Sequence, residues 1–271
     1  MTSAFHYTNN QIKKTMETIY TLLSALKGQQ RQMDTVSNNL ANVNTPGYKQ
    51  DQVMFKEYYN KMSGQDLESE EEKFAHEDFT SPYNRGNSSF VFTDHVSPLM
   101  HKGDFRATDN PYDLAIQTEG FFVVETPMGH RYTRNGHFLR DSEGYLITSA
   151  GDKVLGEKGP IKITGKEFSV GSDGKIIVDA KETDTFQIMA FKEPHRMNKL
   201  GNSYWAPGSK GQKPIKFDNV VIQQGAIEGS NVDSIQEMVR MITVNRTYEA
   251  AQKAIRSTDD LDEKSISIAR I

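Results

Sequence analysis

Apolar residues in the first 40 positions recur at alternating steps of four and three. The set is Ile12, Met16, Ile19, Leu23, Leu26, Met33 and Leu40. Gln30 and Ser37 occupy the two intervening positions of the same repeat. A repeat near 3.5 residues per turn is typical of a helix that packs along another long helix. The pattern therefore predicts a long N-terminal helix, opened by a capping box at Thr8 and Gln11.

The last part of the chain, from Asp233 to Ile271, contains neither Gly nor Pro. Its apolar residues also recur at helical spacing: Ile235, Met238, Val239, Ile242, Tyr248, Ala251, Ile255, Leu261 and Ile268. Ser234 and Glu237 fit a capping box, so a second helix should begin there. At about 1.5 Å per residue it would span about 58 Å, which is more than a domain of this size needs. We predict that the two helices pair as a coiled coil; the alternative is that each is an ordinary amphipathic helix of an α/β domain.

The first helix is expected to end in an Asn-rich turn. The sequence there is Asn38-Asn39-Leu40-Ala41-Asn42-Val43-Asn44-Thr45-Pro46-Gly47-Tyr48-Lys49. Pro46 disfavours the helical conformation at Thr45, and Gly47 can adopt a positive φ. The Asn side chains can bond backbone groups that the helix end leaves unpaired. The chain should therefore turn sharply near Pro46.

Between Phe90 and Gln224 the apolar period changes toward two, which is the period of a β-strand. The candidate strands are 114–116, 121–124, 132–134, 138–139, 145–147, 153–155, 161–163, 168–170, 175–178, 186–191 and 220–223. Turn sequences such as Asn135-Gly136 separate them. The predicted fold class is α+β, in which paired terminal helices enclose a central all-β domain of short antiparallel strands.

The predicted elements divide the chain into five segments. They are an N-terminal helix at 1–45, a turn and connection at 46–63, an acidic linker or extension at 64–89, the β domain at 90–226 and a C-terminal helix at 227–271. The acidic segment contains seven carboxylates between Asp66 and Asp78, against Lys73 alone. Their mutual repulsion disfavours compact packing of that segment.

The composition argues against several classes of function. The net charge of -4 favours neither nucleic acid nor an anionic lipid surface as a partner. The chain contains no Cys, which excludes disulfides and catalysis or metal binding by a thiolate. We expect no cleavable signal peptide, because the first 25 residues are polar and mixed, and no membrane span, because no apolar run approaches about 20 residues.

Catalytic and cofactor motifs are not evident, so we expect no enzyme activity, no cofactor and no metal. His130 and His137 flank a predicted hairpin with Asp141 near, but a solvated hairpin is the simpler interpretation. The stretch from Gly159 to Lys166 departs from the spacing of a phosphate-binding loop.

Three blocks of the sequence together are similar to flagellar axial proteins, the family of rod, hook and hook-associated proteins. They are the Asn-rich turn, the β-domain block that begins Asn110-Pro111-Tyr112-Asp113, and the C-terminal block that includes Gly225 to Val232 and Arg246 to Glu249. The positions that carry the motif are Asn38, Asn39, Leu40, Ala41, Asn42, Thr45, Pro46, Gly47, Asn231, Arg246, Tyr248 and Glu249. Length and the sequence Val154-Leu155-Gly156 are most like those of proximal rod members, with distal rod members second.

The resemblance implies a structural subunit that polymerises head-to-tail into a helical tube, which transmits torque and encloses the export channel. It implies terminal helices lining the tube, partners that are further copies and neighbouring rod subunits, and passage through the flagellar type III export apparatus. The expected location is the basal body, in the periplasm. A distal rod or hook-like subunit is the nearest alternative. The more distant ones are a secreted enzyme acting on cell-wall glycan, with Asp141 and Glu143 as its carboxylates, and a soluble adaptor or export chaperone.

Overall fold

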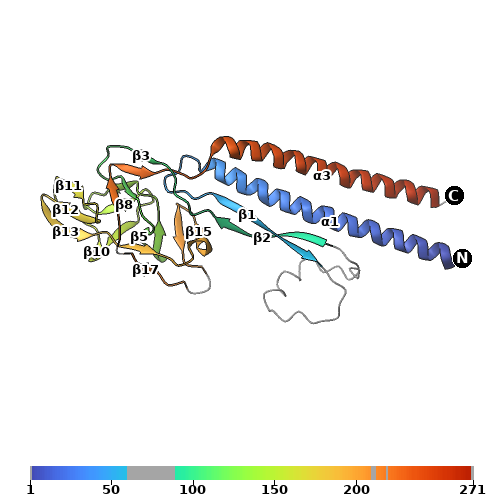
Figure 1. The fold of residues 1–271 in the computed structure, drawn as a ribbon, viewed down its shortest axis with the longest axis horizontal. Helices are drawn as coiled ribbons and strands as arrows, with labels where there is room; N and C mark the ends of the chain where they lie inside the picture. Colours follow the sequence, from blue (N-terminus) through green and yellow to red (C-terminus); the bar gives the residue numbers. More distant parts are fainter. Residues whose placement is uncertain (1, 60–88, 209–211, 218, 270–271) are drawn as a thin grey trace. The chain divides into compact units, whose positions relative to one another are not determined.

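The computed structural model describes residues 2–59, 89–208, 212–217 and 219–269. Among the described residues, two α-helices lie at the ends of the chain: α1 spans Thr2–Ala41 and α3 spans Ser234–Ala269 (Figure 1). A 3-10 helix, η1, spans Pro194–Arg196. The chain divides into two compact units. One contains Met1–Ser37, Val53–Val96 and Met238–Ile271; the other contains Asn38–Gln52 and Ser97–Glu237.

Strands make up most of the other elements. Within the described residues they are β1 (Asp51–Tyr59), β2 (Ser89–Pro98), β3 (Phe105–Ala107), β4 (Leu114–Ile116), β5 (Phe121–Thr126), β6 (Gly129–Thr133), β7 (Phe138–Arg140), β8 (Leu146–Thr148), β9 (Lys153–Gly156), β10 (Gly159–Pro160), β11 (Phe168–Val170), β12 (Lys175–Val178), β13 (Lys181–Thr185), β14 (Ile188–Ala190), β15 (Asn198–Leu200), β16 (Tyr204–Ala206), β17 (Ile215–Lys216), β18 (Ile222–Gln224) and β19 (Ala226–Glu228). The candidates at 114–116, 168–170 and 175–178 coincide with strands, whereas 161–163 lies outside the named strands.

The largest sheet has ten strands, with the main order β15-β16-β6-β5-β9-β8-β7. β10 pairs with β9, and β14 pairs with both β5 and β17. A three-stranded sheet has the order β11-β12-β13, and β1-β2, β18-β4 and β19-β3 form two-stranded sheets. The pairs β19-β3 and β18-β4 link the residues just before α3 to the start of the β region.

Strand β5 shows why the β region has two hydrophobic clusters. Successive side chains of a strand point to opposite faces. Phe122 and Val124 enter one cluster, while Phe121 and Val123 enter the other, which also holds Trp205. These four residues of β5 are all buried. The continuous apolar run of β5 therefore reflects a strand covered on both faces.

The predicted fold class is wrong. The described residues contain nineteen strands and only two α-helices, so the protein is mostly β and is not built around a pair of coiled-coil helices. Positions assigned to the coiled-coil seam of α3 lie exposed: Ile235 at 70%, Val239 at 59%, Ile242 at 55% and Leu261 at 62%. A closed seam would have buried these side chains.

The reason is that α3 has two apolar faces. Met241, Val244, Tyr248 and Ile255 lie on its less exposed side, with Val244 buried. At about 100° per residue, the exposed residues Ile235, Met238, Val239 and Ile242 lie on roughly the opposite side. The predicted stripe took its first four members from the exposed face and Tyr248 and Ile255 from the other. Spacing alone did not separate the two faces.

The predicted helix starts also need correction. α1 begins at Thr2 instead of Thr8. α3 begins at Ser234, but its cap is Asp233, whose Oδ1 accepts hydrogen bonds from the backbone N–H groups of Ile235 (2.9 Å) and Gln236 (3.1 Å). Glu237 is consequently available for contacts elsewhere.

Some predicted elements and side chains lie outside the described residues. Residues 60–88 are not described, so the predicted acidic linker at 64–89 is outside the described residues except for Ser89. The side chains of Ile12, Met16 and Ile19 lie outside the described part of α1. In the described part of α1, Leu23 is exposed, whereas Leu26, Met33 and Leu40 are partly buried.

Candidate functional site: a buried polar junction

The turn after α1 is held by its own Asn side chains. Asn42 Nδ2 donates to the carbonyl oxygen of Asn38 at 2.8 Å, and Thr45 Oγ1 donates to Asn42 Oδ1 at 3.1 Å. Gly47 has a φ of 67° and donates its backbone N–H to the carbonyl oxygen of Glu228 at 2.8 Å. The Asn-rich motif therefore forms a turn that ends against the residues preceding α3.

Asn39 uses its whole side-chain amide in this turn. It is completely buried. Its Nδ2 donates to the carbonyl oxygen of Asp51 (2.9 Å) and to Glu237 Oε2 (3.3 Å). Its Oδ1 accepts from the Asp51 backbone N–H (2.8 Å) and from the Tyr48 hydroxyl (3.1 Å). Burial, with Asp51 adding to it, raises the pKa of Tyr48, so that hydroxyl stays a donor. The motif asparagine thus joins the end of α1 to the first turn of α3.

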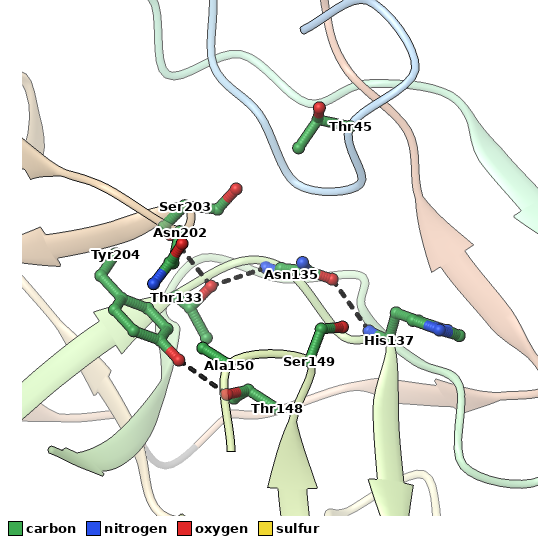
Figure 2. A pocket seen from close by; sticks show the side chains of 10 residues that line it. All are labelled: Thr45, Thr133, Asn135, His137, Thr148, Ser149, Ala150, Asn202, Ser203 and Tyr204. Carbon is green, nitrogen blue, oxygen red and sulfur yellow. Dashed lines mark hydrogen bonds between the residues drawn. The ribbon is translucent and has the colours of Figure 1, made fainter. Parts of the chain in front are cut away.

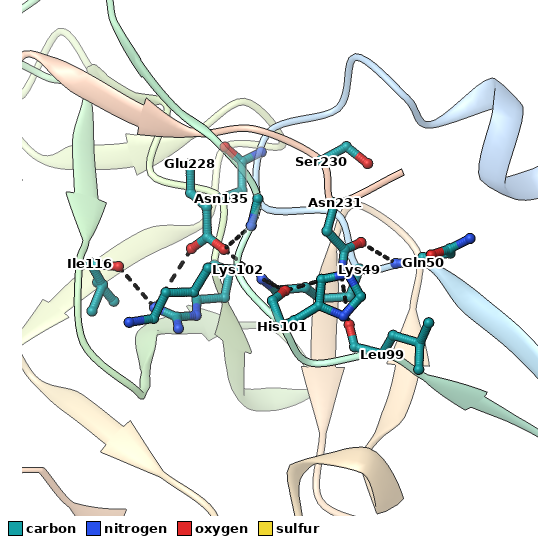
Figure 3. A network of polar contacts seen from close by, with 12 residues as sticks. Lys49, Gln50, Leu99, His101, Lys102, Ile116, Asn135, Glu228, Ser230 and Asn231 are labelled. Atoms are coloured by element: carbon teal, nitrogen blue, oxygen red, sulfur yellow. Dashed lines mark hydrogen bonds and ion pairs between the residues drawn. The ribbon is translucent and has the colours of Figure 1, made fainter. Parts of the chain in front are cut away.

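Asn231 makes a second connection of the same kind. Its Oδ1 accepts the backbone N–H of Gln50 at 2.6 Å, and its Nδ2 donates to the carbonyl oxygens of Leu99 (2.8 Å) and His101 (3.0 Å) (Figure 3). The Gln50 side chain donates to Glu237 Oε1 at 2.7 Å. One amide therefore holds together three segments that are far apart in sequence.

A buried ion pair lies beside these amides. Lys49 Nζ is 2.5 Å from Glu228 Oε1, and both side chains are only 1% exposed. Lys49 also donates to the His101 carbonyl oxygen at 2.9 Å. Arg134, 6% exposed, lies 3.7 Å from Glu228 Oε2 and donates to the Ile116 carbonyl oxygen at 3.1 Å. Burial lowers the pKa of both Lys49 and Arg134, and Glu228 opposes that shift in each.

Lys199 on β15 anchors the same turn to the ten-stranded sheet. Its Nζ donates to the Lys49 carbonyl oxygen and lies 2.9 Å from Asp51 Oδ1. It also lies over the rings of Tyr48 and Trp205, at 3.9 and 5.5 Å from their centroids. A desolvated ammonium over aromatic faces adds to the stability of such a contact. Burial lowers the pKa of Lys199, while Asp51 opposes the shift.

These contacts define what we call the junction: Asn39, Tyr48, Lys49, Arg134, Lys199, Glu228, Asn231 and Glu237. All of these residues belong to the unit formed by Asn38–Gln52 and Ser97–Glu237. The junction binds the residues that follow α1 and those that begin α3 to one β scaffold. Most of its polar groups bond one another or nearby backbone groups, while Glu228 Oε2 forms no hydrogen bond and faces Arg134 at 3.7 Å. This is the arrangement of a structural clamp.

Replacing Gly47 by Ala should open the junction. A Cβ there would lie 2.4 Å from the Arg134 carbonyl carbon and 2.5 Å from the Asn135 backbone nitrogen, in addition to the positive φ. We expect the free energy of unfolding to fall by more than about 2 kcal/mol, measured by urea denaturation. Gly151→Ala is the matched control, since Gly151 has a φ of 90° and nothing within 4 Å of its added Cβ. Equal losses in the two variants would contradict the clash argument.

A shallow pocket of about 250 Å³ lies next to the junction turn. Its lining consists of Thr45, Thr133, Asn135, His137, Thr148, Ser149, Ala150, Asn202, Ser203 and Tyr204 (Figure 2). Thr148 Oγ1 and the Tyr204 hydroxyl are 2.7 Å apart, and burial raises the pKa of Tyr204 to about 12. None of the lining residues carries a carboxylate, so this pocket does not provide the acid pair that glycoside hydrolysis uses.

The residues considered for catalysis or metal binding have other contacts. Asp141 Oδ1 accepts the backbone N–H groups of Glu143 (2.9 Å) and Tyr145 (2.7 Å), which is turn chemistry. His137 Nδ1 lies 2.7 Å from Asp113 Oδ1, while His130 is in β6 opposite Glu125. Across the described ranges, no group of three or more His, Asp or Glu side chains comes together as a metal site.

Some of the residues predicted to carry the family motif lie in the junction, and others lie on the surface of α3. Asn39, Gly47 and Asn231 are central to the junction, and Asn38, Asn42 and Thr45 shape its turn. Leu40 and Pro46 are partly buried beside them, and Ala41 is exposed. Arg246 and Glu249 are exposed on α3, and Tyr248 is partly buried.

No role was predicted from the sequence for four charged members of the junction: Lys49, Arg134, Lys199 and Glu228. Lys49 and Glu228 lie in the quoted blocks but received no role. A signal was present, because Glu228 follows Ala226 and Ile227 directly, and a carboxylate at the end of an apolar run is rarely buried unless it is paired. Lys199 gave no such signal, because its partners lie far away in sequence.

Models of known protein families match three separate stretches of the chain. Three family models match: "Flagella basal body rod protein" over residues 19–49, "Flagellar hook protein FlgE/F/G D1 domain" over 115–178 and "Flagellar basal body rod FlgEFG protein C-terminal" over 223–268. Every junction residue except Lys199 lies within one of these three matches.

Similar curated proteins cover nearly the whole chain. Flagellar basal-body rod protein FlgG of Bacillus subtilis is 31% identical over 269 residues, covering 94% of this chain and 100% of that protein. Flagellar basal-body rod protein FlgF of Caulobacter vibrioides is 30% identical over 252 residues, covering 92% and 96%. FlgF of Mesorhizobium japonicum is 28% identical over 253 residues, covering 92% and 96%.

The sequence and the junction define a protein in which the turn after α1 and the residues that lead into α3 are bound to one β scaffold. The chain belongs to the family of flagellar basal-body rod proteins, as the resemblance predicted. In the described part of the chain, neither helix combines the length and the apolar character that a membrane crossing requires.

Proposed function

We propose that this chain is a structural subunit of the flagellar basal-body rod that polymerises head-to-tail into a helical tube. The observation that carries the proposal is the exposed apolar face of α3, formed by Ile235, Met238, Val239 and Ile242. Large apolar side chains gathered on one exposed face mark an interaction surface. In a rod-family chain, the partners that fit this face are further copies and neighbouring rod subunits.

Head-to-tail assembly follows from the symmetry of such contacts. A contact between two different surfaces of identical subunits gives an open helical polymer when the rotation between neighbours does not close. A tube built in this way would transmit torque through its packed subunits and leave an axial channel for export. The segments 1–45 and 227–271 would supply the assembly helices, and 90–226 would supply the folded scaffold.

We also propose where the subunit lies in the rod and how it is exported. The proposed rod position is proximal, on the basis of the length and the Val154-Leu155-Gly156 sequence. A distal rod or hook-like position is the alternative, because relatives named FlgF and FlgG match over similar lengths. The subunit is exported through the flagellar type III apparatus without a cleavable signal and works in the periplasmic part of the basal body. It acts as a structural subunit and not as an enzyme, and its net charge of -4 does not favour nucleic acid as a partner.

Electron microscopy of basal bodies from a strain lacking this chain tests the function and the position together. We expect such cells to be non-motile and their basal bodies to lack a complete rod. A proximal subunit leaves no rod beyond the membrane ring, whereas a distal subunit leaves a short rod. Complete rods in the deletion strain would overturn the proposal.

A further inference from the structure

One surface of the β region has an unbalanced positive charge. Between residues 192 and 216 the sequence has six Lys or Arg residues and a single acid, Glu193. Four of these cations are exposed in the described residues: Lys192, Arg196, Lys213 and Lys216. We call these four residues the basic surface.

Strand pairing brings the two parts of the basic surface together. β14 and β17 are antiparallel, with Met189 opposite Lys216 and Ala190 opposite Ile215. Beyond the strands, Gln212 Nε2 donates to the Glu193 carbonyl oxygen at 3.0 Å, a side-chain contact between the same two segments. Extending the strand register by two residues past Ala190 and Ile215 would place Lys192 opposite Lys213.

Two lysines at opposite positions repel each other, which costs stability in an isolated chain. The two nearby acids are already engaged: Glu193 lies 3.4 Å from Arg196, and Glu157 lies 2.6 Å from Lys216. Within the described residues, neither Lys192 nor Lys213 is in an ion pair. An anionic partner would offset this repulsion.

The chain itself contains a segment of suitable chemistry. Residues 66–78 include seven carboxylates and only Lys73 in opposition, the strongest negative run in the sequence. We propose that the basic surface of one copy binds the acidic segment 66–78 of a neighbouring copy. The inference rests on the proposed function, because an open helical assembly requires each subunit to carry two different, complementary surfaces.

A cysteine pair tests this contact directly, since the chain contains no Cys of its own. The variant carries Lys213→Cys together with Glu71→Cys and is oxidised as assembled rods. We expect disulfide-linked dimers and longer ladders on non-reducing gels. The matched control replaces Lys181, an exposed lysine of β13, by Cys in combination with Glu71→Cys, and should stay monomeric.

Charge reversal provides the second measurement. Lys192→Glu with Lys213→Glu should raise the concentration needed for polymerisation roughly fivefold, the effect expected of exposed ion pairs. Adding Glu70→Lys and Glu71→Lys should restore it. The contact should also weaken as salt increases, because screening shortens the reach of exposed charges.

The possible failures are distinguishable. Rods that assemble normally but give no ladder, or that tolerate the reversal unchanged, overturn the charge contact and leave the proposed function intact. A fast-migrating oxidised monomer assigns the acidic segment to its own copy and also overturns the inference. Failure of the unmodified chain to enter rods counts against the proposed function itself.

Discussion

Replacing Glu228 with Gln is expected to lower the free energy of unfolding by about 3–5 kcal/mol. The carboxylate is the counter-ion for Lys49 at 2.5 Å and for Arg134 at 3.7 Å, and all three side chains are nearly inaccessible to water. The neutral amide would leave two buried cations without an opposite charge. Urea denaturation followed by circular dichroism measures the loss.

A surface pair of similar length provides the control. Glu157 lies 2.6 Å from Lys216, but the two side chains are 44% and 59% exposed. Glu157→Gln should therefore change the free energy of unfolding by no more than about 1 kcal/mol. The contrast separates the effect of burial from that of distance.

A double variant tests whether the buried charge is the cause. Combining Lys49→Met with Glu228→Gln removes one of the two orphaned cations, so it should recover part of the loss. A Glu228→Gln protein as stable as the parent would show that water reaches this site and that the ion pair does not stabilise the junction.

The sequence predicted best those elements whose structure depends on neighbouring residues alone. The Asn-rich turn was predictable because Pro46 and Gly47 restrict the backbone and because Asn side chains bond nearby main-chain groups. Strand β11 was predictable because Phe168 and Val170 alternate with Ser169, and β12 was predictable because its short apolar run follows a turn sequence. These are local rules, and they hold before the tertiary fold is known.

Other features depended on contacts that spacing cannot reveal. Which face of α3 is covered depends on the residues that pack against it, so one predicted stripe combined exposed Ile242 with the less exposed face of Tyr248. Glu237 fitted a capping box, yet its carboxylate bonds Asn39 and Gln50, more than 180 residues away in sequence. Local rules identify what a side chain can bond, and the fold decides which partner it meets.

Ile242→Asp is expected to abolish incorporation into rods while leaving the folded monomer intact. Ile242 is 55% exposed and lies among Ile235, Met238 and Val239 on the same face of α3. A charge at an exposed helix position should change the free energy of unfolding by less than about 0.5 kcal/mol. Once neighbouring subunits cover that face, the same carboxylate would be buried without a partner, which costs several kcal/mol for each contact made.

Two measurements keep folding and assembly apart. Thermal unfolding of the purified Ile242→Asp chain should match that of the parent, while motility and rod incorporation are lost in a strain that produces only this variant. Asn245→Asp is the matched control, because it adds the same charge at an exposed position that is already polar. Normal motility with Ile242→Asp would mean that this face stays in contact with water in the assembled rod, and the subunit contacts would then have to lie on other surfaces.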